Sequence, residues 1–512
     1  MQFTQPLHRA LQHQPARTAT IFGDRLRSFR EFADRVARLA GGLRGLGMQP
    51  GDRVAMLGLN SDHYWEYLVA VPWGGGVVNP CNTRWSPAEI AYALADSGSR
   101  ILLVDDHFVP MASELSSAGC RFDAVIHVGG APIPDGMIGV EALIAESDAV
   151  ADAGRRGDDL FGLFYTGGTT GVPKGVMLSH ANFMVSSLAL LAEAAFTRPG
   201  VFLHAAPMFH LADLAFAGVH WIAGNTHCFI PGFTPEATAN AIRDHRVTDT
   251  LLVPTMIQML VDHPVMRGGH DLTSLKTITY GGSPIAEAIL DRALTALPKT
   301  GFLQAYGMTE LSPLATVLPP YFHSPEGRGE NKLRSAGRAG LCVELQVVDS
   351  DGQPVPAGET GEIVVRGPNV MLGYWNKPEQ TAEALRHGWM HTGDAGYLDE
   401  QGFLFVVDRI KDMIITGGEN VFSAEVENAL AQHKAVQACA VIGIPSERWG
   451  ESVHAFVVLA PGASARGDEL SEHCKRLIAG YKCPRSIDFV GELPLSGPGK
   501  VLKAELRKRY PS

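Results

Sequence analysis

Short apolar runs alternate with helix-like segments from about residue 27 to residue 360. The runs cover 53–57, 101–106, 124–130, 202–207, 250–254 and 277–283, and most of them end in Gly, Pro or Asp. Continuous apolar runs of this length, bounded by turn residues, are typical of buried strands. Their alternation with helices predicts an α/β protein with doubly wound sheets, and ligands bind beyond the carboxyl ends of such strands.

The pattern changes in the last hundred residues, where a smaller α+β unit is expected. Helices are predicted near 423–433 and 468–480, and strands near 437–443 and 453–459. We place the boundary near Asp408–Asp412. The expected domains are therefore a large one over 1–408 and a small one over 413–512, joined by residues 409–412.

Composition excludes some classes of function. The chain has 512 residues and a formal net charge of −11, which argues against nucleic acid as a partner because phosphate backbones need a basic face. Seven scattered cysteines without CxxC spacing indicate a reducing compartment and argue against a zinc site. No secretory h-region and no apolar run of about 18 residues is evident, so we expect a cytoplasmic protein without a transmembrane segment. Peripheral membrane contact stays open, as does the choice between monomer and homodimer.

One stretch, YTGGTTGVPKG over 165–175, is too polar and too rich in glycine to be core. Following the apolar run LFGLF, it offers backbone N–H groups, threonine hydroxyls and one lysine ammonium, which together can cradle phosphate oxygens. It is not a Walker A loop, because Pro173 precedes Lys174 and Gly175 follows it. A flexible surface turn is the simpler alternative for a generic cluster of this kind.

The full string resembles the phosphate-loop signature of the adenylate-forming superfamily, which includes acyl-CoA synthetases, adenylation domains of peptide synthetases and luciferases. Gly167 stands where the family usually has serine. Further stretches match in the family's order: PMFH (207–210), YGGSP (280–284), QAYGMTE (304–310), GYWNKPEQT (373–381), WMHTGD (389–394), DRIKDMIITGGENV (408–421), ERWGE (447–451) and PLSGPGKVLK (494–503). The resemblance extends over essentially the whole chain.

The resemblance implies a fold and a reaction. The large domain would contain doubly wound mixed sheets and a distorted barrel, and the small domain would be mobile about a hinge at Lys411. The enzyme would join a carboxylic acid to ATP, releasing pyrophosphate, and then pass the acyl group to a thiol. The implied small molecules are ATP, Mg²⁺, coenzyme A and the acid.

The resemblance also assigns roles in the first step. Lys500 would bridge the carboxylate and the α-phosphate, two anions that repel each other. Glu310 makes sense beside a triphosphate mainly through a metal, so Thr170 and Glu310 are the expected magnesium ligands. Thr309 would reach the α-phosphate. The expected ATP contacts are Thr166, Gly167, Gly168, Thr169, Thr170, Gly171, Lys174, Gly281, Gly282, Ser283, Tyr306, Gly307, Met308, Asp394 and Arg409.

In the second step a domain swing would bring the segment 415–420 to the acyl adenylate, gating access of the thiol. His210 resembles the gate between the acid pocket and the thiol tunnel, either as a proton relay or only as a shaped wall. The residues expected to contact CoA are Gly417, Gly418, Glu419, Trp449, Tyr481, Lys482 and Arg485.

The acid itself is the least determined feature. The stretch 209–224 is overwhelmingly apolar, and the expected pocket residues are Phe209, Trp221, Met256 and Met308. We favour a medium- or long-chain fatty acid, with an aryl acid of the coumarate, ferulate or benzoate type as the alternative. An enzyme that loads a carrier protein's phosphopantetheine is the next alternative, and a non-catalytic nucleotide binder is disfavoured because Lys500, Glu310 and Asp394 are intact. A serine hydrolase is disfavoured because no GxSxG elbow is found.

Overall fold

The structure is a computed structural model that describes residues 1–167, 173–194, 196–283, 285–417, 419–495 and 501–510, apart from the side chains of Lys411 and Asn420. Six of the predicted site residues lie outside these ranges: Gly168, Thr169, Thr170, Gly171, Gly418 and Lys500.

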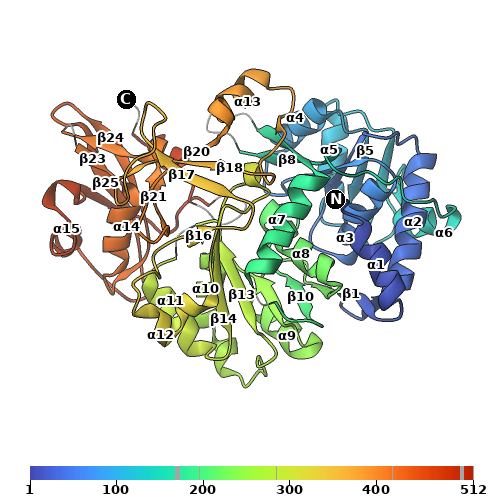
Figure 1. The fold of residues 1–512 in the computed structure, drawn as a ribbon, viewed down its shortest axis with the longest axis horizontal. Coiled ribbons are helices and arrows are strands. Elements are labelled where there is room, and N and C mark those ends of the chain that lie inside the picture. The colour runs from blue at the N-terminus through green and yellow to red at the C-terminus, as the bar shows by residue number, and fades with distance from the viewer. Residues whose placement is uncertain (168–172, 195, 284, 418, 496–500, 511–512) are drawn as a thin grey trace.

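Two large mixed sheets form the N-terminal three quarters of the molecule (Figure 1). The first sheet has nine strands in the described residues and is parallel at its centre, with antiparallel strands at both edges. In spatial order its strands are β16 (Arg338–Ala339), β15 (Thr316–Leu318), β14 (Gly301–Tyr306), β13 (Thr277–Gly281), β12 (Asp249–Leu251), β10 (Val201–His204), β11 (Thr226–Phe229), β1 (Thr18–Phe22) and β2 (Arg25–Ser28).

The second sheet has eight strands among the residues described. Six neighbouring strands are parallel, and β8 and β9 then form an antiparallel hairpin. The order is β19 (Gly373–Tyr374), β9 (Lys174–Ser179), β8 (Leu160–Thr166), β4 (Val77–Pro80), β3 (Arg53–Leu57), β5 (Ile101–Val104), β6 (Ala124–His127) and β7 (Ile138–Gly139).

Two smaller sheets follow along the chain. The region expected as a distorted barrel contains an antiparallel sheet with the order β17 (Glu344–Val348), β18 (Gly361–Arg366), β20 (Met390–Leu398) and β21 (Leu404–Arg409). The last sheet contains β23 (Glu419–Val421), β22 (Ile414–Thr416), β25 (Gly450–Leu459), β24 (Val436–Ser446) and, parallel to β25, β26 (Ser486–Phe489). Its strands all lie after the short 3₁₀ turn η5 (Ile410–Asp412).

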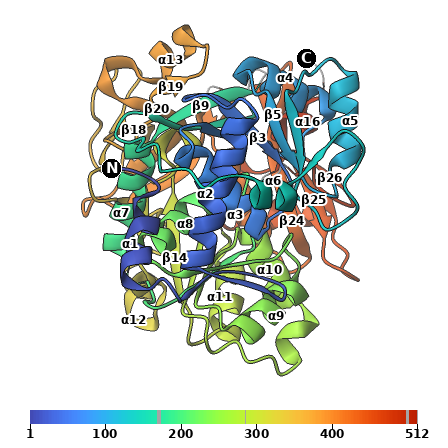
Figure 2. The same cartoon turned by 90° about the vertical axis from the view of Figure 1, so that its right-hand side faces the viewer.

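Helices cover the sheets, and Figure 2 shows α2, α3 and α6 in front of the second sheet. The N-terminal helices are α1 (Gln5–His13), α2 (Phe29–Gly45), α3 (Asp62–Trp73), α4 (Pro87–Ser97), α5 (Val109–Ser117), α6 (Val140–Glu146), α7 (His180–Glu193) and α8 (Leu211–Ala223). The later helices are α9 (Pro235–His245), α10 (Pro254–Asp262), α11 (Glu287–Ala296), α12 (Pro325–Arg328), α13 (Pro378–Ala384), α14 (Ser423–Ala431), α15 (Gly467–Lys475) and α16 (Lys503–Arg507).

One apolar core joins the two large sheets. It includes Val54 and Phe161 from the second sheet and Phe202 and Leu303 from the first, all at most 1% exposed. Burial of side chains on both faces explains why these strands appear in the sequence as unbroken apolar runs. The six predicted strands are confirmed. Four of them, β5, β6, β10 and β12, end before the Gly, Pro or Asp residues of their runs, and β13 ends at Gly281.

The C-terminal predictions are also confirmed. The expected helices correspond to α14 and α15, and the expected strands to β24 and β25. This unit has an apolar core of its own that contains Ile414, Val441, Val453 and Leu470. In the described part of the chain, no helix is both long and apolar enough to cross a membrane.

Candidate active site

The carboxyl ends of β13 and β14 meet at one edge of the first sheet. Gly281 pairs with Ala305 in register, so Gly282 lies beside Tyr306. A Cβ at Gly281 would collide with the carbonyl oxygen of Ala305, and Gly282 has a φ of +79°. Both positions therefore favour glycine, and they leave bare backbone at the strand ends, where a flat ring can approach closely. Ser283 follows in the same turn.

Three predicted residues from distant motifs are in contact at this edge. The Tyr306 hydroxyl donates to Asp394 Oδ2 at 2.8 Å, and Arg409 Nε lies 3.6 Å from Asp394 Oδ1. Asp394 and Arg409 are paired across β20 and β21. Burial, and then the neighbouring Asp394 carboxylate, raise the pKa of Tyr306 well above its usual value, so the phenol stays a proton donor.

A second group surrounds Glu310, in the 3₁₀ turn η2 (Thr309–Leu311) that follows β14. The carboxylate is buried and accepts a hydrogen bond from the Tyr374 hydroxyl at 2.8 Å. Lys174 Nζ lies over the Tyr374 ring, 5.0 Å from its centre. Burial raises the pKa of Glu310, whereas Tyr374, Arg409 and Lys174 oppose that shift. The two groups therefore share one electrostatic environment.

Gly307 and Met308 shape the turn between the two groups. A Cβ at Gly307 would collide with the carbonyl oxygen of Pro313, so the chain turns there only without a side chain. Met308 is half-buried in extended conformation before η2, and Thr309 begins that turn.

The hairpin of β8 and β9 positions the predicted phosphate loop. Thr166 and Lys174 are register partners at the end of the hairpin next to the connecting loop, and Gly167 continues from β8. The ring of Tyr165 lies against Gly175, where a Cβ would be 2.9 Å from the ring. Tyr165 also donates to Asp96 Oδ2 at 2.7 Å, which anchors the loop end of the hairpin on α4.

Sequence reasoning missed the roles of Tyr165, Asp96 and Tyr374. Two of these residues lie inside the quoted motifs, but their function depends on partners far along the chain. Asp96 belongs to no motif, and no signal in the sequence singles it out.

Some of the residues expected around the acid lie in the loop before α8, and the others pack in the apolar core. His210 is the N-cap of α8, where its Nδ1 accepts from the backbone N–H of Ala212 at 3.3 Å. Phe209 is 8% exposed, and its ring lies edge-to-face with that of His210, with centroids 6.5 Å apart. Met308 packs on the same core, and Met256 belongs to a second apolar cluster with Ile257 and Leu260.

Trp221 is a core side chain in this structure. It is 1% exposed, and its indole N–H donates to the Phe3 carbonyl oxygen at 2.8 Å. The rings of Trp65 and Phe32 pack edge-to-face against it, with centroids 5.5 and 6.0 Å away. These contacts place the indole in the core, and a role for Trp221 in the acid pocket stays a prediction.

The residues expected to contact CoA cluster on the last sheet. The guanidinium of Arg485 lies over the Trp449 ring, 4.8 Å from its centre, and donates to Thr416 Oγ1 at 2.8 Å. Gly417 has a φ of +63°, and a Cβ there would be 3.0 Å from the Trp449 indole. Lys482 is paired with Glu425 at 2.8 Å, while Glu419 and Tyr481 are exposed.

Of the two expected magnesium ligands, Glu310 lies within the described residues and Thr170 lies outside them. Among the described residues no group of three or more His, Cys, Asp or Glu side chains could hold a metal by itself. Glu310 offers one carboxylate, and the nearby cations Arg409 and Lys174 could offset the charge of a polyphosphate. Mg²⁺ is commonly held by one or two carboxylates together with substrate phosphates, so the residues present fit a metal that arrives with the nucleotide.

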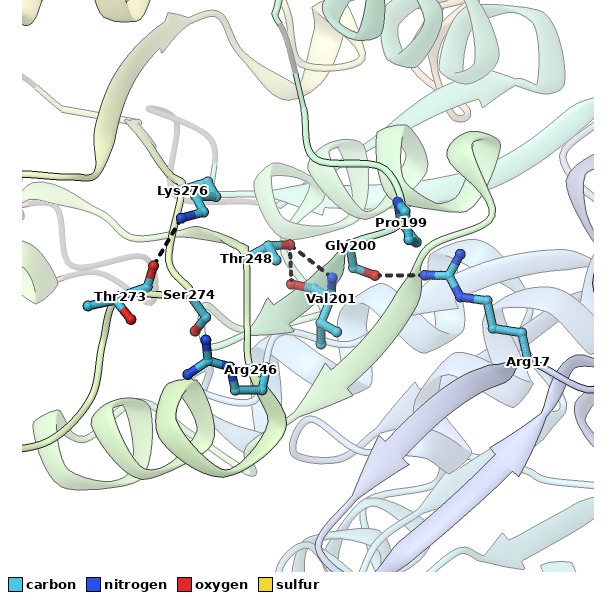
Figure 3. A pocket seen from close by; sticks show the side chains of 9 residues that line it. All are labelled: Arg17, Pro199, Gly200, Val201, Arg246, Thr248, Thr273, Ser274 and Lys276. Atoms are coloured by element: carbon cyan, nitrogen blue, oxygen red, sulfur yellow. Dashed lines mark hydrogen bonds between the residues drawn. The ribbon is translucent and has the colours of Figure 1, made fainter.

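A separate hollow of about 490 Å³ lies at the amino ends of β10 and β13 (Figure 3). Arg17, Arg246 and Lys276 are among its lining residues. Arg17 donates to Gly200 O, Lys276 to Thr273 O, and Arg246 pairs with Asp271. The hollow is at the opposite edge of the sheet from Tyr306 and plays no part in the candidate site.

The family models decide the class. Residues 7–375 match the AMP-binding enzyme family and residues 425–500 match the AMP-binding enzyme C-terminal domain. The protein belongs to the adenylate-forming AMP-binding enzymes. This AMP-binding enzyme is an AMP-forming acid–thiol ligase of the CoA ligase class, for which ATP and CoA are the typical substrates.

Three relatives place this AMP-binding enzyme more closely. A feruloyl-CoA synthase from Amycolatopsis sp is 42% identical over 511 residues, covering 99% of this chain and 98% of that protein. A fatty acid–[acyl-carrier-protein] ligase from Streptomyces coeruleorubidus is 36% identical, covering 98% and 94%. The crystal structure of the anthranilate CoA ligase AuaEII with anthranoyl-AMP superposes with a TM-score of 0.91 at 25% identity, covering 99% and 97%. The α/β fold is thereby confirmed, and an aryl acid is better supported than the fatty acid that we favoured from the sequence.

Proposed function

We propose that the protein is an aryl acid–CoA ligase that activates a hydroxycinnamate-type acid such as ferulate. The observation that carries this proposal is the 42% identity to a feruloyl-CoA synthase over nearly the full length of both chains. The similarity to a ligase seen with anthranoyl-AMP supports a ring-bearing acid as well.

In the first step, two anions must approach each other. Lys174 and Arg409, whose charges already act on the buried Glu310, would offset the charge of the triphosphate. Thr166 and Gly167 through Gly171, with Thr309, would hold phosphate oxygens. Lys500 would supply the remaining ammonium between the acid carboxylate and the α-phosphate.

The nucleoside would lie over the ends of β13 and β14. Gly281, Gly282 and Ser283 would leave room for adenine beside Tyr306. Asp394 would accept hydrogen bonds from ribose hydroxyls, since Tyr306 and Arg409 hold its carboxylate in place. Mg²⁺ would be held by Glu310 and Thr170 and would neutralise phosphate charge when bound.

The second step would use the small domain. We propose the division 1–408, hinge 409–412 and 413–512, with rotation about Lys411. The rotation would withdraw Lys500 and bring Gly417 and Gly418 to the adenylate, leaving a narrow passage for the pantetheine arm. Arg485, stacked on Trp449, would offer a flat cationic surface to the CoA head. Tyr481 and Glu419 would be further CoA contacts. Lys482 would have to leave Glu425 before it could contribute charge.

A medium- or long-chain fatty acid is the second candidate, with CoA or a carrier protein as acceptor. The 36% identity to a fatty acid–[acyl-carrier-protein] ligase favours it. Both candidates share the first step and differ in the acid and the thiol.

The test is a panel of ferulate, 4-coumarate, benzoate, octanoate and palmitate, scored by ATP-dependent pyrophosphate release. Thioester formation is then measured with free CoA and with a phosphopantetheinylated carrier protein. We expect the largest kcat/KM with a hydroxycinnamate and a product that needs CoA alone. A preference for palmitate contradicts the aryl proposal, and product formed only on the carrier protein contradicts the CoA proposal. Nucleotide binding without pyrophosphate release from any acid would indicate a non-catalytic binder.

A further inference from the structure

The loop between β10 and α8 carries Phe209 and His210, which the sequence predicts to line the acid pocket and its gate. It begins after His204 and ends at the His210 cap of α8. Ala205, Ala206, Met208 and Phe209 of this loop are at most 8% exposed, so its backbone groups need hydrogen-bond partners from the rest of the protein. Buried polar side chains hold this one from two sides.

Asn60 holds the loop from the second sheet. It lies between β3 and α3 and is 4% exposed. Its Nδ2 donates to His204 O at 3.2 Å and to Ala206 O at 2.9 Å, and its Oδ1 accepts from Met208 N at 2.8 Å. A single amide therefore binds three backbone groups within five consecutive residues of a segment 144–148 positions away. All the amide's atoms are used on this loop.

Asp213 and His204 hold the loop from its two ends. His204 Nδ1 donates to Asp213 Oδ2 at 2.6 Å, joining the last residue of β10 to the first turn of α8. The second ring nitrogen of His204 lies 2.9 Å from His227 Nδ1 on β11. Asp213 and His204 are at most 1% exposed, and burial raises the pKa of Asp213 while lowering that of His227.

These polar groups are costly to bury. Asp213 Oδ1 and His227 Nε2 have no hydrogen-bond partner among the residues described. An apolar pair of similar volume would avoid this desolvation cost. What a buried polar pair can contribute in return is a specific geometry, because its hydrogen bonds have fixed directions. The geometry imposed here is the path of residues 205–210.

We propose that Asn60 and the Asp213–His204 pair are positioning residues that fix Phe209 and His210 against the acid. The inference rests on the proposed function, because it assigns the acid side of the site to this loop. Neither group touches the nucleotide region around Tyr306, so their loss should affect the acid and not ATP. A displacement of about 1 Å in such a wall is enough to reduce turnover by about a hundredfold.

The test compares Asn60→Ala with Asn79→Ala. Asn79 is also a buried asparagine of the second sheet, 1% exposed, but its amide binds Ser97 and Ser99, far from the loop. In acid-dependent ATP–pyrophosphate exchange, we expect Asn60→Ala to raise the KM for the acid at least about tenfold and the KM for ATP by less than about twofold. Asn79→Ala should leave both constants within about twofold at a similar loss of thermal stability. Equal kinetic effects of the two variants would overturn the proposal.

Asp213 gives a second pair of variants. Asp213→Asn keeps an oxygen that accepts from His204, whereas Asp213→Leu removes the acceptor. We expect Asp213→Leu to raise the KM for the acid and Asp213→Asn to restore it to within about threefold of the unsubstituted protein. If the Asn variant is as impaired as the Leu variant, or if neither is impaired, Asp213 does not act through the loop.

Amide hydrogen exchange separates failure of this inference from failure of the proposed function. Exchange over residues 205–210 should be faster in Asn60→Ala than in Asn79→Ala, whether or not any acid of the panel is activated. Unchanged exchange contradicts the positioning role even in an active enzyme. Faster exchange in a protein that activates no acid would leave the positioning of the loop standing and refute the ligase proposal.

Discussion

The hydroxyl of Tyr306 lies 2.8 Å from Asp394 Oδ2, although 88 positions separate the two residues. Tyr306 ends a strand of the first large sheet, and Asp394 lies in the antiparallel sheet of β17, β18, β20 and β21. The bond joins two sheets at the edge where Gly281 and Gly282 leave the backbone bare, and Arg409 completes the group from β21.

Tyr306→Phe should weaken ATP binding. The substitution removes a hydrogen bond to a carboxylate, a contribution of about 1.5–3 kcal/mol, so we expect the KM for ATP to rise about tenfold or more. The KM for the acid should change less than about threefold. Tyr280→Phe on the adjacent strand is the control, because its hydroxyl bonds to His323. Equal effects of both variants on ATP would contradict the assignment.

Gly417→Val should block the second step alone. The new side chain would press on Trp449 and require a left-handed backbone, which costs about 1–2 kcal/mol. Pyrophosphate exchange should persist, while CoA thioester formation falls at least about tenfold. Gly462→Val is the control, since Gly462 has a φ of +74° with open space around it. If both variants transfer the acyl group equally well, Gly417 does not line the CoA path.

Lys500→Ala should block the first step and spare the second, the reverse of the effect expected for Gly417→Val. Adenylate formation from acid and ATP should fall at least about a thousandfold, because no other group is proposed to bridge the two anions. Thioester formation from supplied acyl adenylate and CoA should stay within about threefold. Lys508→Ala, which removes an exposed lysine paired with Glu505, is the control. Similar losses in both half-reactions would refute the role.

Asp249→Asn should change how stability depends on pH. Burial raises the pKa of Asp249 to about 6, partly offset by the hydroxyl of Thr248. Between about pH 4 and 6 the folded protein retains a proton that the unfolded chain releases, so stability falls as pH rises through this window, by up to about 3 kcal/mol. The Asn variant lacks this loss. The difference in free energy of unfolding between the variant and the unsubstituted protein should therefore favour the variant more at pH 7 than at pH 4.5. Denaturant unfolding at the two pH values measures this difference.

Asp271→Asn supplies the opposite sign for comparison. Thr273 and Arg246 lower the pKa of Asp271 to about 2, so its contribution is present above its unfolded pKa and lost as pH falls. Asp271→Asn should therefore lower the free energy of unfolding more at pH 7 than at low pH. A shift of the same sign in both variants would contradict the prediction for the aspartate whose expected sign it reverses.

The sequence predicts local structure well where burial leaves a simple signal. The parallel strands β3, β5 and β10 are apolar on both faces, and the patterns locate them to within a few residues. The order of the strands depends on contacts between distant segments, such as β1 beside β11, which no local pattern encodes. Trp221 shows the limit for side chains: an apolar stretch does not reveal which of its residues faces a pocket and which faces the core.

The sequence predicts those residues of the candidate site that lie within recognisable motifs. Tyr306, Asp394 and Arg409 come from three motifs, and the structure brings them into contact. Asn60 was missed, because its importance lies entirely in the backbone groups of a loop more than 140 positions later. A buried amide that supports other residues has the same appearance in the sequence as an asparagine in a turn.

The pairing of Thr166 with Lys174 has a consequence for how this enzyme can change over generations. The ladder of β8 and β9 fixes the register on both sides of the glycine-rich segment, and a slip by one residue would turn every following side chain to the opposite face. A change of length that shifted this ladder would point the Lys174 side chain away from the nucleotide, and a substitution that changed the groups proposed to hold phosphate would weaken nucleotide binding. Natural variation in this segment should therefore be restricted both in length and at the residues proposed to bind phosphate.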